Sequence, residues 1–270
     1  MKIIKFGGKS LANGKGLERV IELIEAKSSQ EEIGIVLSAR GNTTDQLESL
    51  LDRARDGVFD TQGLEEVLSY QLVSSPNSDL RDSFEKLHKI LKGVSILRDF
   101  SAKIKDEFLA QGELMSVKVV CDRLRSNGYK AQEIDTRELL LTDSDFGNAQ
   151  PQEDLSSEKF EQNRENWEGA IPVFTGFIGA NSQGETTTLG RNGSNYSASL
   201  IANFLNASEL ESFTHVSGIY TANPDWVAQA QQIEYLSYQE ANEMANFGTT
   251  VLHAKTIIPL IEKNIPLRIL

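Results

Sequence analysis

The fold is decided by residues 1–38, MKIIKFGGKSLANGKGLERVIELIEAKSSQEEIGIVLS. In this stretch Lys2–Phe6 is a short apolar run typical of a strand, Gly16–Ala26 has apolar residues at helical spacing, and Ile33–Ser38 is a second apolar run. A strand, a helix and a second strand in this order form a βαβ unit, which predicts an α/β fold with a parallel central sheet.

Small and polar residues follow both predicted strands. Ligands of open α/β sheets bind beyond the carboxyl ends of the strands. Glycine in such a turn lets the backbone approach a bound group closely. We therefore expect one crevice to be lined by Gly7, Gly8, Lys9, Ser10 and Ser38.

A second glycine-rich turn lies in Thr186–Asn195, TTTLGRNGSN, and runs into an apolar helix predicted over Tyr196–Leu205. Backbone N–H groups near Gly193 and Ser194 are expected to face outward, with the positive end of the helix dipole behind them. The guanidinium of Arg191 has the planar shape that suits a carboxylate or a phosphate. Two turns that are suited to anions indicate phosphoryl transfer.

Both turns resemble motifs of the aspartokinase branch of the amino acid kinase family, which read KFGGTS near the N-terminus and TTLGRGGSD further on. Here residues 5–10 read KFGGKS and residues 187–195 read TTLGRNGSN. Further matches follow in the family's order at residues 36–39, 112–116, 174–178, 214–224 and 247–253. The resemblance covers essentially the whole chain and implies a three-layer α/β/α sandwich with a mainly parallel sheet.

The resemblance also implies the domain organisation, a single amino acid kinase domain over residues 1–270. Residues 1–168 are expected to form an N-terminal substrate lobe with a helical insertion at 45–110, and residues 169–270 a C-terminal nucleotide lobe. Within them, the polar stretch Asp143–Gln162 predicts a loop with edge elements, and Ile171–Ile178 predicts a buried strand. The ACT domains that usually follow in aspartokinases are missing, so feedback control through them is not expected.

Composition limits the class of protein. The net charge of −12 disfavours nucleic acid and anionic membranes as partners. The single cysteine, Cys121, lies in an apolar helical pattern and is expected to be a buried spacer. Without a targeting segment or a run of about 20 apolar residues, the chain is expected to be cytoplasmic. The resemblance implies a homodimer or pairing with a related kinase subunit.

Moving a phosphoryl group from ATP to a carboxylate requires cations and backbone donors that offset negative charge. Lys5 matches the family lysine that contacts the transferring phosphate, and Gly7 and Gly8 allow the backbone to approach the nucleotide. Lys9 stands where the family has threonine and brings a further cation, so it is expected to be catalytic together with Lys5, with an ordinary surface charge as the alternative. No cluster of His, Cys and carboxylates has metal-ligand spacing, so Mg²⁺ is expected only as the ion that ATP carries.

The resemblance assigns the substrate residues as well. Arg191 matches the residue that clamps the substrate α-carboxylate, and Glu113 matches a carboxylate that faces the substrate amino group. Hydroxyl groups are expected from Ser38, Thr44 and Ser194, each of which has the alternative role of capping a turn or a helix. The substrate and the nucleotide expected on this basis are an amino acid and ATP.

Several charged positions of the family pattern are missing. Asn195 replaces an aspartate that helps to receive the substrate amino group. In the nucleotide half, Thr214, His215, Tyr220 and Thr250 match binding positions, but His215 replaces an aspartate and Thr250 replaces a lysine. Asp225 replaces an arginine near the phosphates. If each lost contact costs about 3 kcal/mol, two partly additive losses slow the reaction roughly 10⁴-fold.

Three hypotheses follow for the function. The first is an aspartokinase-type phosphotransferase that converts ATP and L-aspartate to 4-phospho-L-aspartate in amino-acid biosynthesis, with full or reduced activity. The second is a catalytically degenerate paralogue, or pseudoenzyme, that binds a ligand or serves as a partner subunit. The third is a kinase for a different small carboxylate, in which Asn195 and Lys9 remodel the pocket.

Overall fold

The computed structural model describes residues 1–214, 218–222, 226–246 and 254–270. Over these residues, six strands form one sheet in the order β10-β7-β1-β2-β4-β3, and every neighbouring pair is parallel. The strands are β1 (Lys2–Phe6), β2 (Ile33–Leu37), β3 (Ala131–Ile134), β4 (Ile171–Thr175), β7 (Leu210–Phe213) and β10 (Leu267–Ile269).

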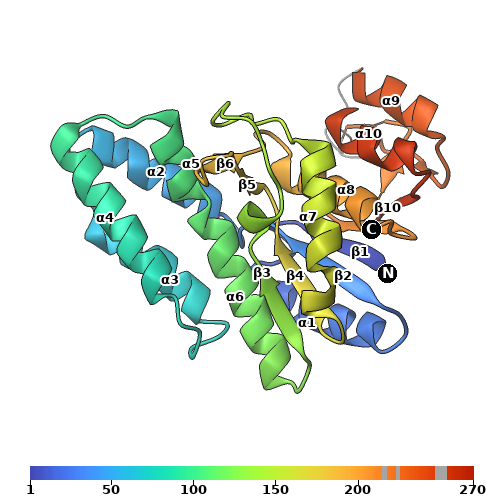
Figure 1. The fold of residues 1–270 in the computed structure, drawn as a ribbon, viewed down its shortest axis with the longest axis horizontal. Helices are drawn as coiled ribbons and strands as arrows, with labels where there is room; N and C mark the ends of the chain where they lie inside the picture. Colours follow the sequence, from blue (N-terminus) through green and yellow to red (C-terminus); the bar gives the residue numbers. More distant parts are fainter. Residues whose placement is uncertain (215–217, 223–225, 247–253) are drawn as a thin grey trace.

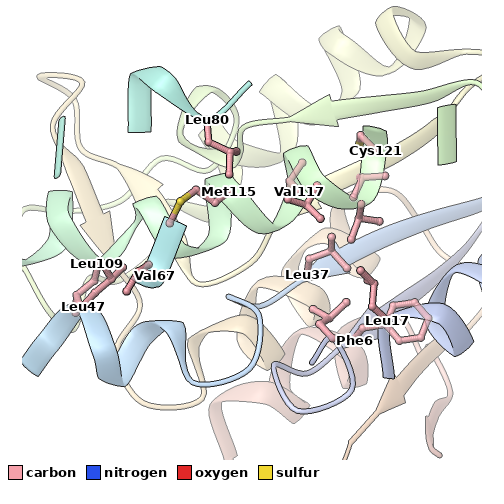
Figure 2. Packing of buried hydrophobic residues seen from close by; sticks show 14 of the residues in the cluster. Phe6, Leu17, Leu37, Leu47, Val67, Leu80, Leu109, Met115, Val117 and Cys121 are labelled. Carbon is pink, nitrogen blue, oxygen red and sulfur yellow. The ribbon is translucent and has the colours of Figure 1, made fainter. Parts of the chain in front are cut away.

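Side chains of the central strands alternate between the two faces of the sheet, because successive residues of a strand point in opposite directions. Ile4 and Phe6 of β1 pack into one apolar cluster, whereas Ile3 packs into the other. Figure 2 shows the first cluster, in which Phe6 and Leu37 lie beside Leu17 and Val117. Buried apolar residues on both faces require a helical layer on each side.

Helices supply those two layers (Figure 1). Helices α1 (Lys15–Ser28) and α6 (Gln111–Ser126) pack on the face that carries Phe6. Helix α8 (Gly193–Phe204) covers the opposite face, and α7 (Glu153–Asn163) and α10 (Ala254–Glu262) pack against it. The predicted three-layer α/β fold with a parallel sheet is therefore confirmed.

The helical insertion predicted over residues 45–110 corresponds to four helices over residues 43–109, which lie together at one side of the molecule (Figure 1). These are α2 (Thr43–Arg55), α3 (Thr61–Leu72), α4 (Arg81–Leu97) and α5 (Ala102–Leu109). Their buried side chains, such as Leu47 and Leu87, belong to the same apolar cluster as β1 and α6. None of the helices in the described ranges is long and apolar enough to span a membrane.

Two local predictions were wrong. The expected strand over residues 171–178 ends at Thr175, because Phe177 takes a left-handed backbone conformation (φ 68°) and β5 (Ile178–Ala180) then pairs antiparallel with β6 (Thr186–Thr188). The polar stretch over residues 143–162 contains α7, whose buried Ser156 and Phe160 lie four residues apart on one face. Its only other apolar residue, Leu155, is exposed, so the sequence shows no helical period of apolar residues.

The remaining described elements are short. Strands β8 (Ile219–Tyr220) and β9 (Gln232–Ile233) pair antiparallel, and α9 (Tyr238–Asn246) follows them. Short 3₁₀ helices lie at Thr136–Glu138 (η1) and Arg164–Trp167 (η2).

Candidate active site

A pocket of about 350 Å³ lies beyond the carboxyl ends of β1 and β2. Five segments contribute to its lining: residues 5–9 at the end of β1, residues 38–45 after β2, Glu113 in the first turn of α6, Phe177 after β4, and residues 190–195 at the start of α8. The strand order changes direction at β1, since β2 lies on one side of it and β7 on the other. Open α/β sheets bind ligands at such a switch point.

The ammonium group of Lys5 lies at the centre of this region. Lys5 is 6% exposed, and a side chain at Gly7 would begin only 3.3 Å from its Nζ atom, so glycine keeps space open above the ammonium. Burial lowers the pKa of Lys5 to about 8. Within the described residues, Lys5 forms no ion pair or side-chain hydrogen bond. The site therefore holds a buried cation whose charge an anionic ligand can offset.

Lys5 also lines a second, smaller cavity of about 20 Å³ on the β7 side. Asn195 contributes to both cavities, and Ser212 and Thr214 of the β7 segment contribute to the smaller one. The two cavities thus meet at Lys5 and Asn195. A ligand group bound in the larger pocket can therefore lie close to a ligand group bound in the smaller cavity.

Glu113 brings a carboxylate into the larger pocket. Its side chain is 3% exposed, and its Oε1 atom accepts a hydrogen bond from the N–H of Ala39 at 3.0 Å. Its Oε2 atom has no hydrogen-bond partner among the described residues. Burial raises the pKa of Glu113 to about 8, and the bond from Ala39 only partly opposes this shift. A substrate ammonium would supply the missing donor and favour the ionised form.

The turn before α8 depends on its small residues. Gly190 has φ 76°, and a side chain there would lie 2.9 Å from the carbonyl oxygen of Gly147. Asn192 is left-handed (φ 60°), a conformation that asparagine tolerates. A side chain at Gly193 would begin 2.5 Å from the ring of Phe177. These constraints place Ser194 and Asn195 in the first helical turn, facing the pocket.

The Oδ1 atom of Asn195 is a second acceptor without a hydrogen-bond partner among the described residues. It belongs to the same pocket as Glu113. Two residues with free acceptor atoms and the cation of Lys5 give the pocket mixed polarity. That combination suits a ligand that carries both a positive and a negative group.

The α8 turn is anchored by the buried carboxylate of Asp106 on α5. Asp106 Oδ2 accepts hydrogen bonds from the N–H groups of Gly147 and Thr188, both at 2.8 Å, and Oδ1 accepts one from Thr188 Oγ1 at 2.9 Å. Burial raises the pKa of Asp106, and these bonds oppose the rise. Thr188 ends β6, so Asp106 fixes the strand that leads into the turn.

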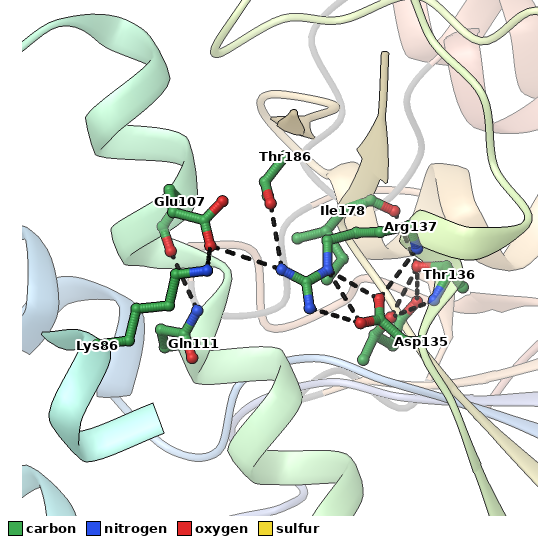
Figure 3. Close-up of polar contacts among 9 residues, drawn as sticks. Lys86, Glu107, Gln111, Asp135, Thr136, Arg137, Ile178 and Thr186 are labelled. Atoms are coloured by element: carbon green, nitrogen blue, oxygen red, sulfur yellow. Dashed lines mark hydrogen bonds and ion pairs between the residues drawn. The ribbon is translucent and has the colours of Figure 1, made fainter. Parts of the chain in front are cut away.

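Arg137 joins the same strand to the helical segment, as Figure 3 shows. Its guanidinium lies between Glu107 of α5, at 3.6 Å, and Asp135, whose Oδ1 atom accepts from Nε at 2.9 Å. It also donates to Thr186 Oγ1 of β6 at 3.1 Å. Lys86 of α4 forms an ion pair with Glu107. This network holds α4, α5, η1 and β6 together.

Most of the predicted site residues come together in the larger pocket: Lys5, Gly8, Lys9, Ser38, Thr44, Glu113, Ser194 and Asn195. Gly7 lies beside the ammonium of Lys5 and Thr214 lines the smaller cavity. Arg191 is exposed and is not a lining residue, although its neighbours Gly190 and Asn192 are.

The other predicted nucleotide residues lie away from these cavities or outside the described chain. Tyr220 is half-buried in β8. His215 and Thr250, like Asp225, lie outside the described residues.

Sequence reasoning missed Arg40, Asn42, Asp45 and Phe177. Asn42, Asp45 and Phe177 line the pocket, and Arg40 is a buried residue between the lining residues Ala39 and Gly41. The cluster of polar residues after β2 was the available signal, because that strand end was already expected to face the crevice. The left-handed Phe177 left no signal in the sequence.

A sequence model described as the amino acid kinase family matches residues 1–270. The chain belongs to the amino acid kinase family. The predicted resemblance to the catalytic domain of aspartokinases is confirmed over the whole chain.

Individual relatives agree with this assignment. The lysine-sensitive aspartokinase 3 of Escherichia coli is 32% identical over 274 residues, which cover 98% of this chain and 60% of that protein. A bifunctional aspartokinase/homoserine dehydrogenase of Buchnera aphidicola is 31% identical over 280 residues, which cover 98% of this chain and 34% of that protein. The chain thus spans between about a third and three-fifths of the length of these relatives.

A solved structure shares the fold in detail. The crystal structure of E. coli aspartokinase III in complex with aspartate and ADP superposes with a TM-score of 0.89 at 29% identity, and the match covers 100% of this chain and 61% of that chain. Aspartate and ADP are bound in that protein.

Proposed function

We propose that the chain is the catalytic domain of an aspartokinase-type phosphotransferase that converts ATP and L-aspartate to ADP and 4-phospho-L-aspartate. The observation that supports this most directly is the pocket in which the buried cation of Lys5 and the buried carboxylate of Glu113 meet. An amino-acid substrate carries an ammonium for Glu113 and carboxylates for cationic groups. The complex of E. coli aspartokinase III with aspartate and ADP supports the same pair of ligands.

In the proposed reaction, an oxygen of the substrate side-chain carboxylate attacks the γ-phosphorus of ATP. The bond between that phosphorus and the β–γ bridging oxygen breaks, so ADP leaves with the electron pair and no proton needs to move. Lys5 offsets the charge on the transferring group from its position between the two cavities. ATP enters with its Mg²⁺, which neutralises part of the phosphate charge.

The remaining pocket residues orient the acceptor in this proposal. Glu113 receives the ammonium through its free Oε2 atom, and the neutral oxygen of Asn195 accepts a second hydrogen bond. Ser38, Thr44 and Ser194 bind carboxylate oxygens through their hydroxyl groups, and Lys9 approaches the phosphates from the loop after β1. Arg191, exposed beside the pocket, reaches the α-carboxylate only when the substrate is bound.

A second candidate function is a ligand-binding or partner subunit without turnover. The substitutions at Asn195, His215, Asp225 and Thr250 favour it, because each removes a charge that the family pattern carries. A kinase for another small carboxylate is a variant of the first proposal, and Asn195 favours it because a neutral amide attracts an ammonium less strongly than a carboxylate does.

Hydroxylamine traps an acyl phosphate as a hydroxamate, which gives a direct test. The protein is incubated with Mg-ATP, hydroxylamine and either aspartate or another small carboxylate, and calorimetric titration with aspartate and with ADP is run in parallel. Hydroxamate formation with aspartate supports the first proposal. Binding without turnover supports the subunit, and turnover with a different acid alone redirects the substrate assignment.

A matched pair of lysine variants makes the test specific to the site. Lys5→Met removes the pocket cation and is expected to lower turnover about 10²- to 10³-fold, as loss of one charge-stabilising donor does. Lys2→Met, on the same strand, breaks an ion-pair cluster with Glu31 and Glu209 away from the pocket. Equal activity of the two variants would contradict the role of Lys5.

A further inference from the structure

Arg40, in the loop after β2, is completely buried, with 0% of its side chain exposed. Its Nε atom donates to the carbonyl oxygen of Leu11 at 3.2 Å, and Nη1 donates to the carbonyl oxygen of Gln71 at 3.1 Å. Nη2 donates to Ser74 Oγ at 2.8 Å and to the side-chain oxygen of Asn13. The guanidinium thus uses all three nitrogens and binds two separate parts of the chain.

None of these partners carries a negative charge. In the described ranges Arg40 makes no ion pair with a carboxylate, and burial lowers its pKa to about 10. The carbonyl of Gln71 lies at the C-terminal end of α3, where the helix dipole is negative, and the ring of Tyr70 lies 5.5 Å from the guanidinium carbon. These groups stabilise the cation only in part, and an apolar side chain would fill such a site at lower cost.

The backbone on either side of Arg40 reaches the pocket. The N–H of Ala39 donates to Glu113 Oε1 at 3.0 Å, and the N–H of Gly41 donates to the carbonyl oxygen of Gly8 at 2.8 Å. A side chain at Gly8 would lie 2.7 Å from the carbonyl oxygen of Ala39, so the two loops are in close contact there. A shift of Arg40 would therefore move the carboxylate of Glu113 and the Gly8 loop together.

The other end of the network is equally well held. Asn13 donates through Nδ2 to the carbonyl oxygen of Tyr70 at 2.9 Å, and Gln71 Nε2 donates to Thr43 Oγ1 at 2.8 Å. Thr43 Oγ1 in turn donates to the carbonyl oxygen of Arg40 at 2.6 Å. The end of α3, the loop after β1 and the loop after β2 form one hydrogen-bonded unit with the guanidinium at its centre.

We propose that Arg40 is a positioning residue of the active site, which fixes the loop of Gly8 and Lys9 and the loop of residues 38–45 relative to each other by binding both to the end of α3. The proposal rests on the proposed function for its effect on catalysis, whereas the placement of the loops is tested separately. The planar guanidinium of Arg40 donates hydrogen bonds both to the loop after β1 and to the end of α3. The single ammonium group of a lysine cannot reproduce this geometry.

The test compares Arg40→Lys, which keeps the positive charge and loses the planar guanidinium, with Val67→Ala. Val67 is a buried core residue of α3 (Figure 2), so its truncation weakens the packing of the same helix without removing the guanidinium. For each variant we would measure thermal unfolding, the steady-state constants of hydroxamate formation, and hydrogen exchange of the amides of residues 8–13 and 39–44.

Both variants are expected to unfold at lower temperature than the wild type. Only Arg40→Lys is expected to speed amide exchange in the two loops and to lower kcat about 10- to 100-fold, because misplacement by about 1 Å costs up to 10²-fold in rate. Wild-type exchange in Arg40→Lys, or the same loss of kcat in Val67→Ala, would overturn the proposal.

The role of Arg40 can be tested even if Arg40→Lys does not fold or the wild-type protein shows no turnover. If Arg40→Lys does not fold, Ser74→Ala removes one acceptor of the guanidinium and is expected to change exchange in the same loops to a smaller extent; unchanged exchange there contradicts the proposal. If the wild-type protein shows no turnover, the proposed function fails, while the exchange measurement still decides the role of Arg40.

Discussion

At the scale of single residues, the site combines two groups whose pKa values are moved toward each other by burial. Burial brings the pKa of Lys5 down to about 8 and the pKa of Glu113 up to about 8. The proposed reaction needs a protonated Lys5 and an ionised Glu113. The free protein therefore holds this form in part only near pH 8, until ligands with opposite charges stabilise both ions.

This pairing predicts a bell-shaped dependence of kcat/KM on pH with a maximum near pH 8. The rate falls below the maximum because Glu113 takes up a proton, and it falls above the maximum because Lys5 loses one. The measurement is the initial rate of hydroxamate formation from pH 6 to pH 10. Glu113→Gln is expected to remove the acidic limb and to raise the KM for aspartate; an unchanged acidic limb would contradict the assignment.

The stability of Glu113→Gln follows from the same shift. The folded protein holds the Glu113 proton up to about pH 8, whereas the unfolded chain loses it near the ordinary value of 4.5. The folded state therefore binds more protons in this window, and wild-type stability falls as the pH rises through it. In urea unfolding, the free energy of unfolding of Glu113→Gln minus that of the wild type is expected to increase between pH 5 and pH 8. A constant difference would contradict the raised pKa.

The missing family charges give a prediction for four positions. Changing Asn195→Asp, His215→Asp, Asp225→Arg and Thr250→Lys together is expected to raise the rate of hydroxamate formation, because the family charges would again act on the substrate and phosphates. Asn195→Asp alone is expected to lower the KM for aspartate. If the rate of the quadruple variant equals that of the wild type, the roles carried over to these positions are wrong.

At the scale of elements, the turn before α8 depends on strand β6, which Asp106 anchors through two hydrogen bonds from Thr188, while a third comes from the N–H of Gly147. Asp106→Asn turns one acceptor oxygen into a donor that faces N–H or O–H groups. We expect the free energy of unfolding to fall by about 1–3 kcal/mol. Urea unfolding measures this loss, with Glu158→Gln on the exposed surface of α7 as the control. Equal stability of the two variants would remove Asp106 as an anchor.

The elements that the sequence predicts well are those whose period is set by the core. Strand β1 falls on its predicted residues, and α1 and β2 begin and end within two residues of theirs. Prediction failed where tertiary contacts decide the backbone. The left-handed Phe177 splits one apolar run into two strands, and α7 buries too few residues to show a helical period.

The candidate site shows the same division. Lys5 and Glu113 were predictable because they lie in segments, residues 5–10 and 112–116, that resemble motifs of the aspartokinase family. Arg40 was not, because its hydrogen bonds go to Leu11, Asn13 and Gln71, which are far from it in the sequence. No local pattern distinguishes a buried arginine with neutral partners from a solvated one.

At the scale of the whole molecule, one apolar cluster joins the helical segment, the sheet and the α1/α6 layer. Leu47 of α2 is fully buried in it. Leu47→Ala is expected to cost about 2–5 kcal/mol and to destabilise the entire chain in one transition. Far-UV circular dichroism and the fluorescence of Trp167, which lies in the opposite cluster, are expected to change at the same urea concentration. Separate transitions would show that the helices fold as an independent unit.

The lowered pKa of the Lys5 amine, which lies between the two cavities, affects its chemical reactivity. An amine with a pKa near 8 is partly unprotonated at neutral pH and therefore nucleophilic, whereas an ordinary lysine is almost entirely an unreactive ammonium ion. Cyanate is small and anionic, so it can enter a cationic recess and carbamylate Lys5 ahead of the lysines on the surface. A single covalent mark on Lys5 would then report whether the recess is occupied.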